Sequence, residues 1–118
     1  GQPELTLKTE NGCTITFEGG LAIHMELSDN GKYIHLYAEL CNVPEEGKDL
    51  LYERLLEVQV FGYATGGASF GIVKDVGKVI LYRNIELEHL HYDDFYAMLE
   101  FFIELYKTWY LLLASMGY

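Results

Sequence analysis

Hydrophobic and polar residues alternate along residues 13 to 38 with a period of two, which is typical of β-strands that bury one face. The first alternating stretch covers residues 13 to 18. A second covers residues 21 to 27, after the break at Gly19-Gly20, and a third runs from residue 32 to about residue 38. The pattern therefore predicts three consecutive strands.

The turn between the second and third strands sets a register that is tested by matching the polarity of facing residues. Asn30-Gly31 suits a two-residue type I′ turn, which places Asp29 opposite Lys32. Facing residues then agree in polarity, as a sheet with one buried face requires. The apolar pairs are Leu27 with Ile34, Met25 with Leu36 and Ile23 with Ala38, and the polar pairs are Glu26 with His35 and His24 with Tyr37. A three-residue loop in the first hairpin pairs Phe17 with Leu21 and Ile15 with Ile23. We expect a three-stranded antiparallel meander.

The segment from Lys48 to about Val60 has the 3.6-residue period of an amphipathic helix. Its main apolar stripe is Leu51, Leu55 and Val58, and a second flank is formed by Leu50, Leu56 and Val60. A helix with two apolar flanks contacts two neighbours, which we expect to be the sheet and a second subunit. Gly62 is a suitable stop for this helix.

A second hairpin is predicted from Ala68–Lys74 and Lys78–Arg83, which flank a three-residue loop at residues 75 to 77. Such a loop pairs Val73 with Val79, Ile72 with Ile80 and Phe70 with Tyr82. Both faces of this hairpin carry apolar side chains. This indicates burial on both sides, or one side that is reserved for a partner.

A long helix closes the chain, with Asp93 as its N-cap and its end near Ser115. The predicted order of elements is βββαββα. The fold class is therefore α+β, with an antiparallel sheet of about five strands packed against helices.

Composition narrows the class of protein. The 118 residues fit one domain, residues 1–118, and half of them are hydrophobic, which is enough for a core. The 18 acidic and 8 basic residues give a formal net charge of -10, which repels phosphates and excludes nucleic-acid binding. The most apolar stretch, residues 95 to 116, contains Glu100, Glu104 and Lys107, so it predicts a buried helix and no membrane span.

The segment FGYATGGASFG, residues 61 to 71, is rich in glycine and small hydroxyl residues, as phosphate-binding loops are. Such loops follow a strand, open a helix and end in Gly-Lys-Ser/Thr. Here a helix ends and a strand begins, and the first lysine after the glycines is Lys74. We expect Gly66-Gly67 to turn the chain out of the helix, and Gly71 to mark a close approach of another backbone, such as a neighbouring subunit.

The residues that could carry catalysis are few. His89 and His91, next to Asp93 and Asp94, form a short cluster, and alternating histidines on a strand can bind a metal. A small metal-dependent enzyme that uses His89 and His91 is therefore one alternative function. The other interpretation of this cluster is a polar loop whose aspartates complement the dipole of the last helix. An unrelated dimeric protein-interaction module is a further alternative.

Neither cysteine nor serine chemistry is indicated. Cys13 and Cys41 lack the spacing of metal ligands, and two free thiols in a reducing cytosol are favoured over a disulfide. No serine lies in a G-x-S-x-G setting. We assign no catalytic residue, no metal and no cofactor, and we expect a protein that is not an enzyme.

Several segments together resemble the type III secretion chaperones of the Tir-chaperone family. GCTITFEGGLAIHMEL is similar to the opening strands of the family, and AELCNVPEEG to its acidic, proline-bearing connection. LLYERLLEVQVFGYATGGASFG is similar to its middle helix and glycine-rich turn, and YDDFYAMLEFFIELYKTWY to its closing helix. The resemblance covers nearly all of residues 10 to 112. We expect residues 1–118 to lack the family's usual N-terminal helix, which either precedes the given sequence or is missing from this member.

The resemblance implies an acidic cytoplasmic homodimer that binds the N-terminal segment of a type III secretion effector in extended form. The effector is thereby kept soluble and competent for secretion, and the secretion ATPase is a further implied partner. It implies a dimer interface at the middle helix and the strand after the glycine turn: Leu51, Leu55, Val58, Phe61, Ala68, Ser69, Phe70, Gly71 and Ile72.

We expect the effector to contact the meander, at Cys13, Ile15, Phe17, Leu21, Ile23, Met25 and Leu36. Part of the effector would add a strand to a free edge of the sheet. The strand from Cys13 to Glu18 is the predicted edge.

Overall fold

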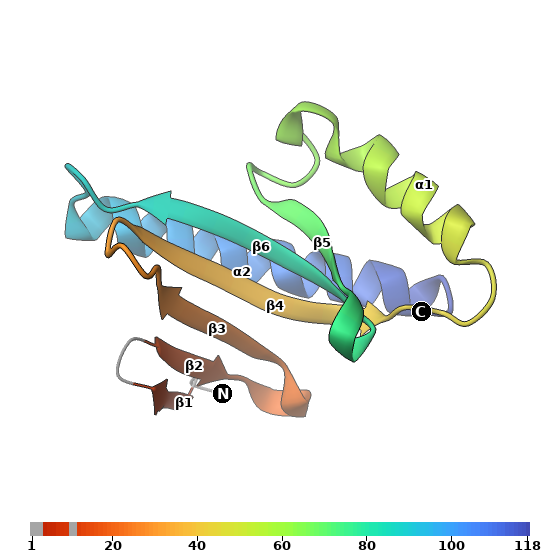
Figure 1. Cartoon of the computed structure of the whole chain (residues 1–118), viewed down its shortest axis with the longest axis horizontal. Helices are drawn as coiled ribbons and strands as arrows, with labels where there is room; N and C mark the ends of the chain where they lie inside the picture. Colours follow the sequence, from red (N-terminus) through yellow and green to blue (C-terminus); the bar gives the residue numbers. More distant parts are fainter. Residues whose placement is uncertain (1–3, 10–11) are drawn as a thin grey trace.

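The computed structural model describes residues 4–9 and 12–118, with side chains from residue 12 onward. The strands are β1 (Glu4–Thr9), β2 (Gly12–Thr16), β3 (Ala22–Leu27), β4 (Tyr33–Asn42), β5 (Ser69–Val73) and β6 (Lys78–Glu86). The helices are α1 (Lys48–Gln59) and α2 (Tyr92–Ser115), and short 3-10 turns follow β2, α1 and β5. All strand pairs are antiparallel, in the spatial order β1-β2-β3-β4-β6-β5. In Figure 1, α2 runs along one face of the sheet and α1 lies beside β5.

The structure confirms the α+β class, the antiparallel sheet and the order of the predicted elements. The predicted register of the meander is also confirmed. Its observed pairs include Ile15 with Ile23, Leu27 with Ile34, Met25 with Leu36, Glu26 with His35 and His24 with Tyr37. The first hairpin closes with a hydrogen bond from the amide of Phe17 to the carbonyl of Leu21, 2.8 Å long, as the three-residue loop requires.

The second turn of the meander differs from the predicted type I′ turn. Ser28 and Tyr33 close it, through a 2.8 Å hydrogen bond from the amide of Ser28 to the carbonyl of Tyr33. Gly31 has a φ of 71°, whereas Asn30 is not among the described non-glycine residues with positive φ. The Asn30 side chain instead accepts bonds from the Ser28 hydroxyl, at 2.7 Å, and the Lys32 amide, at 3.0 Å. These local bonds favour a longer loop that leaves the strand register unchanged.

The register predicted for the second hairpin is wrong by one residue. The structure pairs Phe70 with Leu81, Gly71 with Ile80 and Ile72 with Val79. The reason is a longer loop, since Lys74–Val76 form a 3-10 turn that ends at Gly77 in the left-handed conformation. This register points Val79 and Leu81, both without exposed surface, into the core together.

The first strand of the sheet was not predicted. β1 pairs with β2, with Leu5 opposite Ile15 and Leu7 opposite Cys13, and the register shifts between Leu7 and Thr9. The prediction that the Cys13–Glu18 strand is a free edge is therefore wrong, because β1 occupies that edge. The edge strands of this sheet are β1 and β5.

The last helix begins at Tyr92, with His91 as its N-cap in an extended conformation. Asp93 lies in the first turn, as does Asp94, so the prediction of Asp93 as the N-cap is wrong by two positions. The two aspartates still complement the positive end of the helix dipole.

The core lies between the α2 side of the sheet and the two helices. Helix α2 contributes Phe102, Tyr106 and Leu113, and α1 contributes Leu51 and Leu55. They meet sheet residues without exposed surface, such as Ile23, Leu36, Ala38, Val79 and Leu81. Within the described part of the chain, neither helix is long and apolar enough to cross a membrane.

Candidate functional site

The glycine-rich segment packs against α2. Gly62, Gly66 and Gly67 all have positive φ, which suits glycine. A Cβ on Gly66 would lie 2.1 Å from Cε1 of Phe101, which is closer than any packing tolerates. The indole nitrogen of Trp109 donates to the carbonyl of Ala64, at 3.4 Å. The segment leads from a 3-10 turn into β5, so its glycines serve a turn and a close contact with a helix.

An apolar groove of about 230 Å³ runs between α1 and the edge strand β5. Its lining comes from both elements: Tyr52, Leu55, Leu56, Gln59, Phe70, Gly71 and Ile72. The Gln59 side chain accepts a hydrogen bond from the amide of Phe70, which ties the end of α1 to β5. Leu56 is 64% exposed and Ile72 is 43% exposed, so the groove has apolar walls that face outward.

The structure brings most of the predicted dimer residues to this groove and its surroundings. Leu51, Leu55 and Ala68 are buried within the protomer, while Val58, Ser69, Phe70 and Gly71 are half-buried. Ile72 is exposed, and so is Phe61, at the end of the α1 segment. Two exposed residues that the prediction omitted, Leu56 in the groove and Val60 just after α1, belong to the second apolar flank that the helical period had identified.

The space beside Gly71, where we expected the backbone of a neighbouring subunit, is occupied by side chains of the same chain. A Cβ there would lie 3.2 Å from Cε1 of Tyr82 and 3.5 Å from Cγ1 of Ile80. Tyr82 of the same chain fills the space beside Gly71. The need for glycine at this position is therefore explained within the protomer, without a neighbouring subunit.

The predicted effector-contact residues all lie on the meander, on the face toward α2. Ile15, Ile23 and Leu36 are buried, and Ile23 and Leu36 have no exposed surface. The half-buried members are Cys13, Phe17, Leu21 and Met25. Lys107 of α2 lies over the ring of Phe17, 5.1 Å from its centroid. The accessible part of this surface therefore consists of these four residues.

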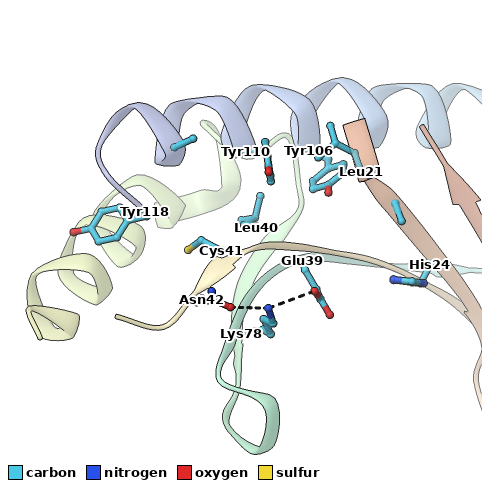
Figure 2. Close-up of a pocket in the computed structure, with 13 residues that line it drawn as sticks. Leu21, His24, Glu39, Leu40, Cys41, Asn42, Lys78, Tyr106, Tyr110 and Tyr118 are labelled. Carbon is cyan, nitrogen blue, oxygen red and sulfur yellow. Dashed lines mark hydrogen bonds and ion pairs between the residues drawn. The ribbon is translucent and has the colours of Figure 1, made fainter. Parts of the chain in front are cut away.

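A larger cleft opens between the end of α2, the start of β3 and the end of β4 (Figure 2). Its volume is about 560 Å³. Its lining is mostly aromatic and polar: Gly20, Leu21, Ala22, His24, Glu39, Leu40, Cys41, Asn42, Lys78, Tyr106, Tyr110, Ala114 and Tyr118. The cleft follows from the strand pairing, because the β3–β4 ladder ends at His24 and Tyr37 and the strands separate beyond that pair.

The walls of the cleft are held by defined contacts. The rings of Tyr106 and Tyr110 meet edge to face, with centroids 6.1 Å apart. Burial raises the pKa of the Tyr106 phenol, while a hydrogen bond from the backbone of Ala22 acts in the opposite direction. Opposite the tyrosines, Lys78 lies 4.0 Å from a Glu39 carboxylate oxygen and donates to Asn42 at 2.6 Å.

Sequence reasoning missed this cleft. The sequence contains ten tyrosines, several of them in or beside the last helix, and nothing in their spacing assigns them a role. The cleft residues come from four distant segments, so no local spacing brings them together.

The histidine cluster shows no metal-binding geometry. His89 is exposed and lies 3.5 Å from a Glu88 oxygen. Among the residues that the structure describes, no group of three or more His, Cys, Asp or Glu side chains could hold a metal ion. Cys13 and Cys41 are free thiols, and burial raises the pKa of each. A raised pKa keeps a thiol protonated and unreactive.

The fold and its surface define a class of protein. An antiparallel sheet with a long helix on one face, with an apolar groove at one edge and an aromatic cleft beneath the helix, suits the binding of polypeptide. The chain belongs to the Tir chaperone protein (CesT) family, which it matches over residues 1–110. Membership of a chaperone family points to a protein that is not an enzyme. Among curated protein sequences, none matches this chain significantly.

Solved structures with the same fold include chains of three complexes. A chain in the crystal structure of the ExsC–ExsE complex has a TM-score of 0.73 and 24% identity, over 96% of this chain and 84% of that one. A chain of the HopA1–SchA chaperone–effector complex has a TM-score of 0.66 and 15% identity, over 90% of this chain and 80% of that one. A chain of the ExoU–SpcU complex from the type III secretion system of Pseudomonas aeruginosa has a TM-score of 0.62 and 13% identity, over 95% of this chain and 83% of that one. At these identities the likeness establishes the fold.

Proposed function

We propose that this protein is a cytoplasmic chaperone that binds the N-terminal segment of a type III secretion effector in extended form. The family match over residues 1–110 is the observation that carries this proposal. Structural neighbours described as a chaperone–effector complex and as a complex of a type III secretion system support it. A bound chaperone would keep the segment soluble and competent for secretion.

The accessible apolar surface of the meander is the proposed contact for this segment. Cys13, Phe17, Leu21 and Met25 lie on the α2 side of the sheet and are half-buried, so each keeps surface for a partner. Because β1 covers the edge of β2, a strand from the effector would add to the outer edge of β1 or displace β1. The net charge of -10 maintains solubility despite such exposed apolar surface.

The proposed active form is a homodimer that associates through the groove between α1 and β5. Leu56 and Ile72 are outward-facing apolar walls of this groove, and Val60 and Phe61, which follow α1 in the chain, are also exposed. Exposed apolar side chains gathered on one part of a small protein favour an interface there. The secretion ATPase is the proposed further partner, through the family resemblance.

Capture from the native host tests the chaperone function. The tagged protein is purified from host cells, captured proteins are identified by mass spectrometry, and each complex is treated with protease. We expect one captured protein whose N-terminal segment alone is protected, because a bound extended segment is shielded while the rest is cleaved at exposed sites.

A matched pair of variants ties this result to the proposed surface. Phe17→Ser is expected to reduce capture, whereas Tyr33→Ser, an aromatic residue on the opposite face of the meander, is expected to leave it unchanged. Protection of a folded domain instead of an N-terminal segment would overturn the proposal.

A further inference from the structure

Two apolar rows cross the α2 face of the sheet and end on β1. Residues that stand opposite one another in a ladder lie on the same face of a sheet. Leu7 and Leu5 therefore hold the outermost register positions of these rows, on the edge strand. The rows are Leu36, Met25, Cys13 and Leu7, and Ile23, Ile15 and Leu5. The sequence Leu-Thr-Leu of β1 thus places two apolar residues, two positions apart, opposite β2.

A single ladder holds β1 in the sheet. β1 is the terminal strand and pairs with β2, and its outer edge carries no other strand of the described chain. The register shifts between Leu7 and Thr9, which interrupts the ladder near its end. In Figure 1, α2 runs behind β4 and β6, whereas β1 lies at the margin of the sheet opposite β5. Release of β1 therefore breaks one ladder, and a strand that takes its place forms equivalent backbone hydrogen bonds.

The edge of β2 gives a partner access to the apolar rows, whereas the outer edge of β1 does not. Neighbouring strands lie about 4.8 Å apart, so a segment added outside β1 would lie about 10 Å from β2. Its side chains would then be separated from Cys13 and Ile15 by β1. A segment on the edge of β2 would instead stand directly opposite these residues and continue both rows.

We propose that the edge of β2 is the docking surface for an extended partner segment with apolar residues two positions apart, and that β1 occupies this edge in the free protein until the segment displaces it. The inference deepens the proposed chaperone function and rests on it for the identity of the partner. The free edge is filled by a segment of the chain itself, and that segment shows which residue pattern the surface accepts.

In this arrangement β1 acts as a tethered competitor of the partner. The apparent affinity of a ligand falls by the fraction of molecules that are in the binding-competent state. With the edge of β2 open in about one molecule in ten, a segment binds about tenfold more weakly than at a permanently open edge. Segments that match the two rows poorly are thereby excluded, because they do not offset the loss of β1.

A disulfide between β1 and β2 tests whether β1 must leave. Leu7 stands opposite Cys13, and opposite residues of an antiparallel pair have Cα atoms about 4.5 to 5.5 Å apart, a span that a disulfide bridges. Leu7→Cys is therefore expected to bond to the native Cys13 on oxidation and to be released by reduction. Cys41→Ala in the same protein removes the other thiol. Thr6→Cys in the same background is the control, because its position is opposite Thr14.

The first probe is a labelled synthetic peptide with the sequence of residues 1–9, GQPELTLKT, which contains the strand that fits this edge. The full chain is titrated into the peptide, and binding is followed by fluorescence anisotropy. We expect saturable binding to the reduced Leu7→Cys protein and binding weaker by about tenfold or more after oxidation, with no such change for Thr6→Cys. The peptide GQPELLTKT, in which the two leucines are adjacent, is the composition-matched control and should bind about threefold more weakly.

A weakened β1 tests the competition from the other side. Leu5→Ser combined with Leu7→Ser removes both apolar residues from β1, so the peptide is expected to bind about tenfold more tightly than to the unaltered protein. Thr6→Ser, between the two leucines, is the matched control and should bind like the unaltered protein. Equal affinity for the oxidised and reduced Leu7→Cys protein would place the peptide at another surface, such as the outer edge of β1, and overturn the inference. Absence of binding to every variant would overturn it as well.

The chaperone function is tested separately, by the protection of an N-terminal segment in captured complexes. That protected segment, made as a peptide, is the second probe for the oxidised and reduced Leu7→Cys protein, and the same difference in affinity is expected. A protein that protects such a segment but binds it equally in both states keeps its proposed function and loses the displaceable strand. Binding of GQPELTLKT that oxidation abolishes, without any captured partner, supports the docking edge and removes the chaperone function.

Discussion

Thr65 lies within the glycine-rich segment with no exposed surface, and its hydroxyl oxygen has no hydrogen-bond partner among the described residues. A buried hydroxyl without a partner costs free energy, because it loses its bonds to water and gains none in return. Thr65 is therefore a residue at which the native side chain lowers the free energy of unfolding.

Replacement of this hydroxyl should stabilise the protein. Thr65→Val keeps the shape of the side chain and removes the unsatisfied group, so we expect the free energy of unfolding to rise by about 1 kcal/mol. Thermal unfolding should show a midpoint about 4 °C higher. Thr108→Val, an exposed position in α2, is the control and should change the midpoint little. A lower midpoint for Thr65→Val would mean that the hydroxyl has a partner in solution.

At the scale of elements, the glycine-rich segment holds α1 and β5 in place relative to α2. The contact at Gly66 admits no side chain because Phe101 and Leu105 lie against it, the latter 2.9 Å from the position of a Cβ. Trp109 of α2 contacts the segment at two points. Its indole nitrogen donates to the carbonyl of Ala64, and its ring meets that of Phe70 edge to face, with 5.1 Å between centroids.

Gly66→Ala tests this packing. We expect a loss of about 2 to 4 kcal/mol in the free energy of unfolding, from the clash with Phe101 and the positive φ of 58°. Chemical denaturation measures it. Gly20→Ala is the control, since Gly20 has a φ of 81° but no atom near its Cβ, and it should lose only about 1 kcal/mol. Addition of Phe101→Ala should make the two losses less than additive; full additivity would disprove the contact.

At the scale of the whole molecule, the groove between α1 and β5 is proposed to join two protomers. Leu55 is buried in the protomer, so a charge there would unfold the chain whether or not it dimerises. Leu56 is 64% exposed and allows a cleaner test, because a charge at this position affects the protomer little.

Leu56→Glu is expected to convert a dimer into a monomer, since two like charges would be buried near the two-fold axis of a symmetric interface. Light scattering after size exclusion measures the mass. Leu111→Glu, which changes a leucine of similar exposure, 66%, on α2, should leave the dimer intact. The interface assignment fails if the mass is the same for both variants, or if Leu111→Glu alone produces a monomer.

The sequence by itself determined the elements whose signals are local. The period-two pattern and the matched polarity of facing residues predicted the register of the meander, from Leu27 with Ile34 to His24 with Tyr37, even though the turn at Asn30-Gly31 adopts another form. The predicted pair of Ile23 with Ala38 lies beyond the end of the observed ladder. The helical period likewise identified the two flanks of α1, one of which is buried and the other exposed. Burial on one side of a strand or helix imposes these periods directly, so they can be read without the fold.

Tertiary structure decided what depends on segments that are distant in the chain. The pairing of β1 with β2 removes the predicted free edge. Residues 4 to 8 do alternate, with apolar Leu5 and Leu7 between polar residues, but this short pattern was overlooked and does not by itself name the strand that β1 joins. The role of Gly66 depends on Phe101, and the cover over Gly71 depends on Tyr82. The cleft arises where β3 and β4 separate beneath α2, so the residues that line it come together only in the folded chain. Local patterns determine which face of an element is apolar, whereas the contacts that this face makes are set by packing across the whole molecule.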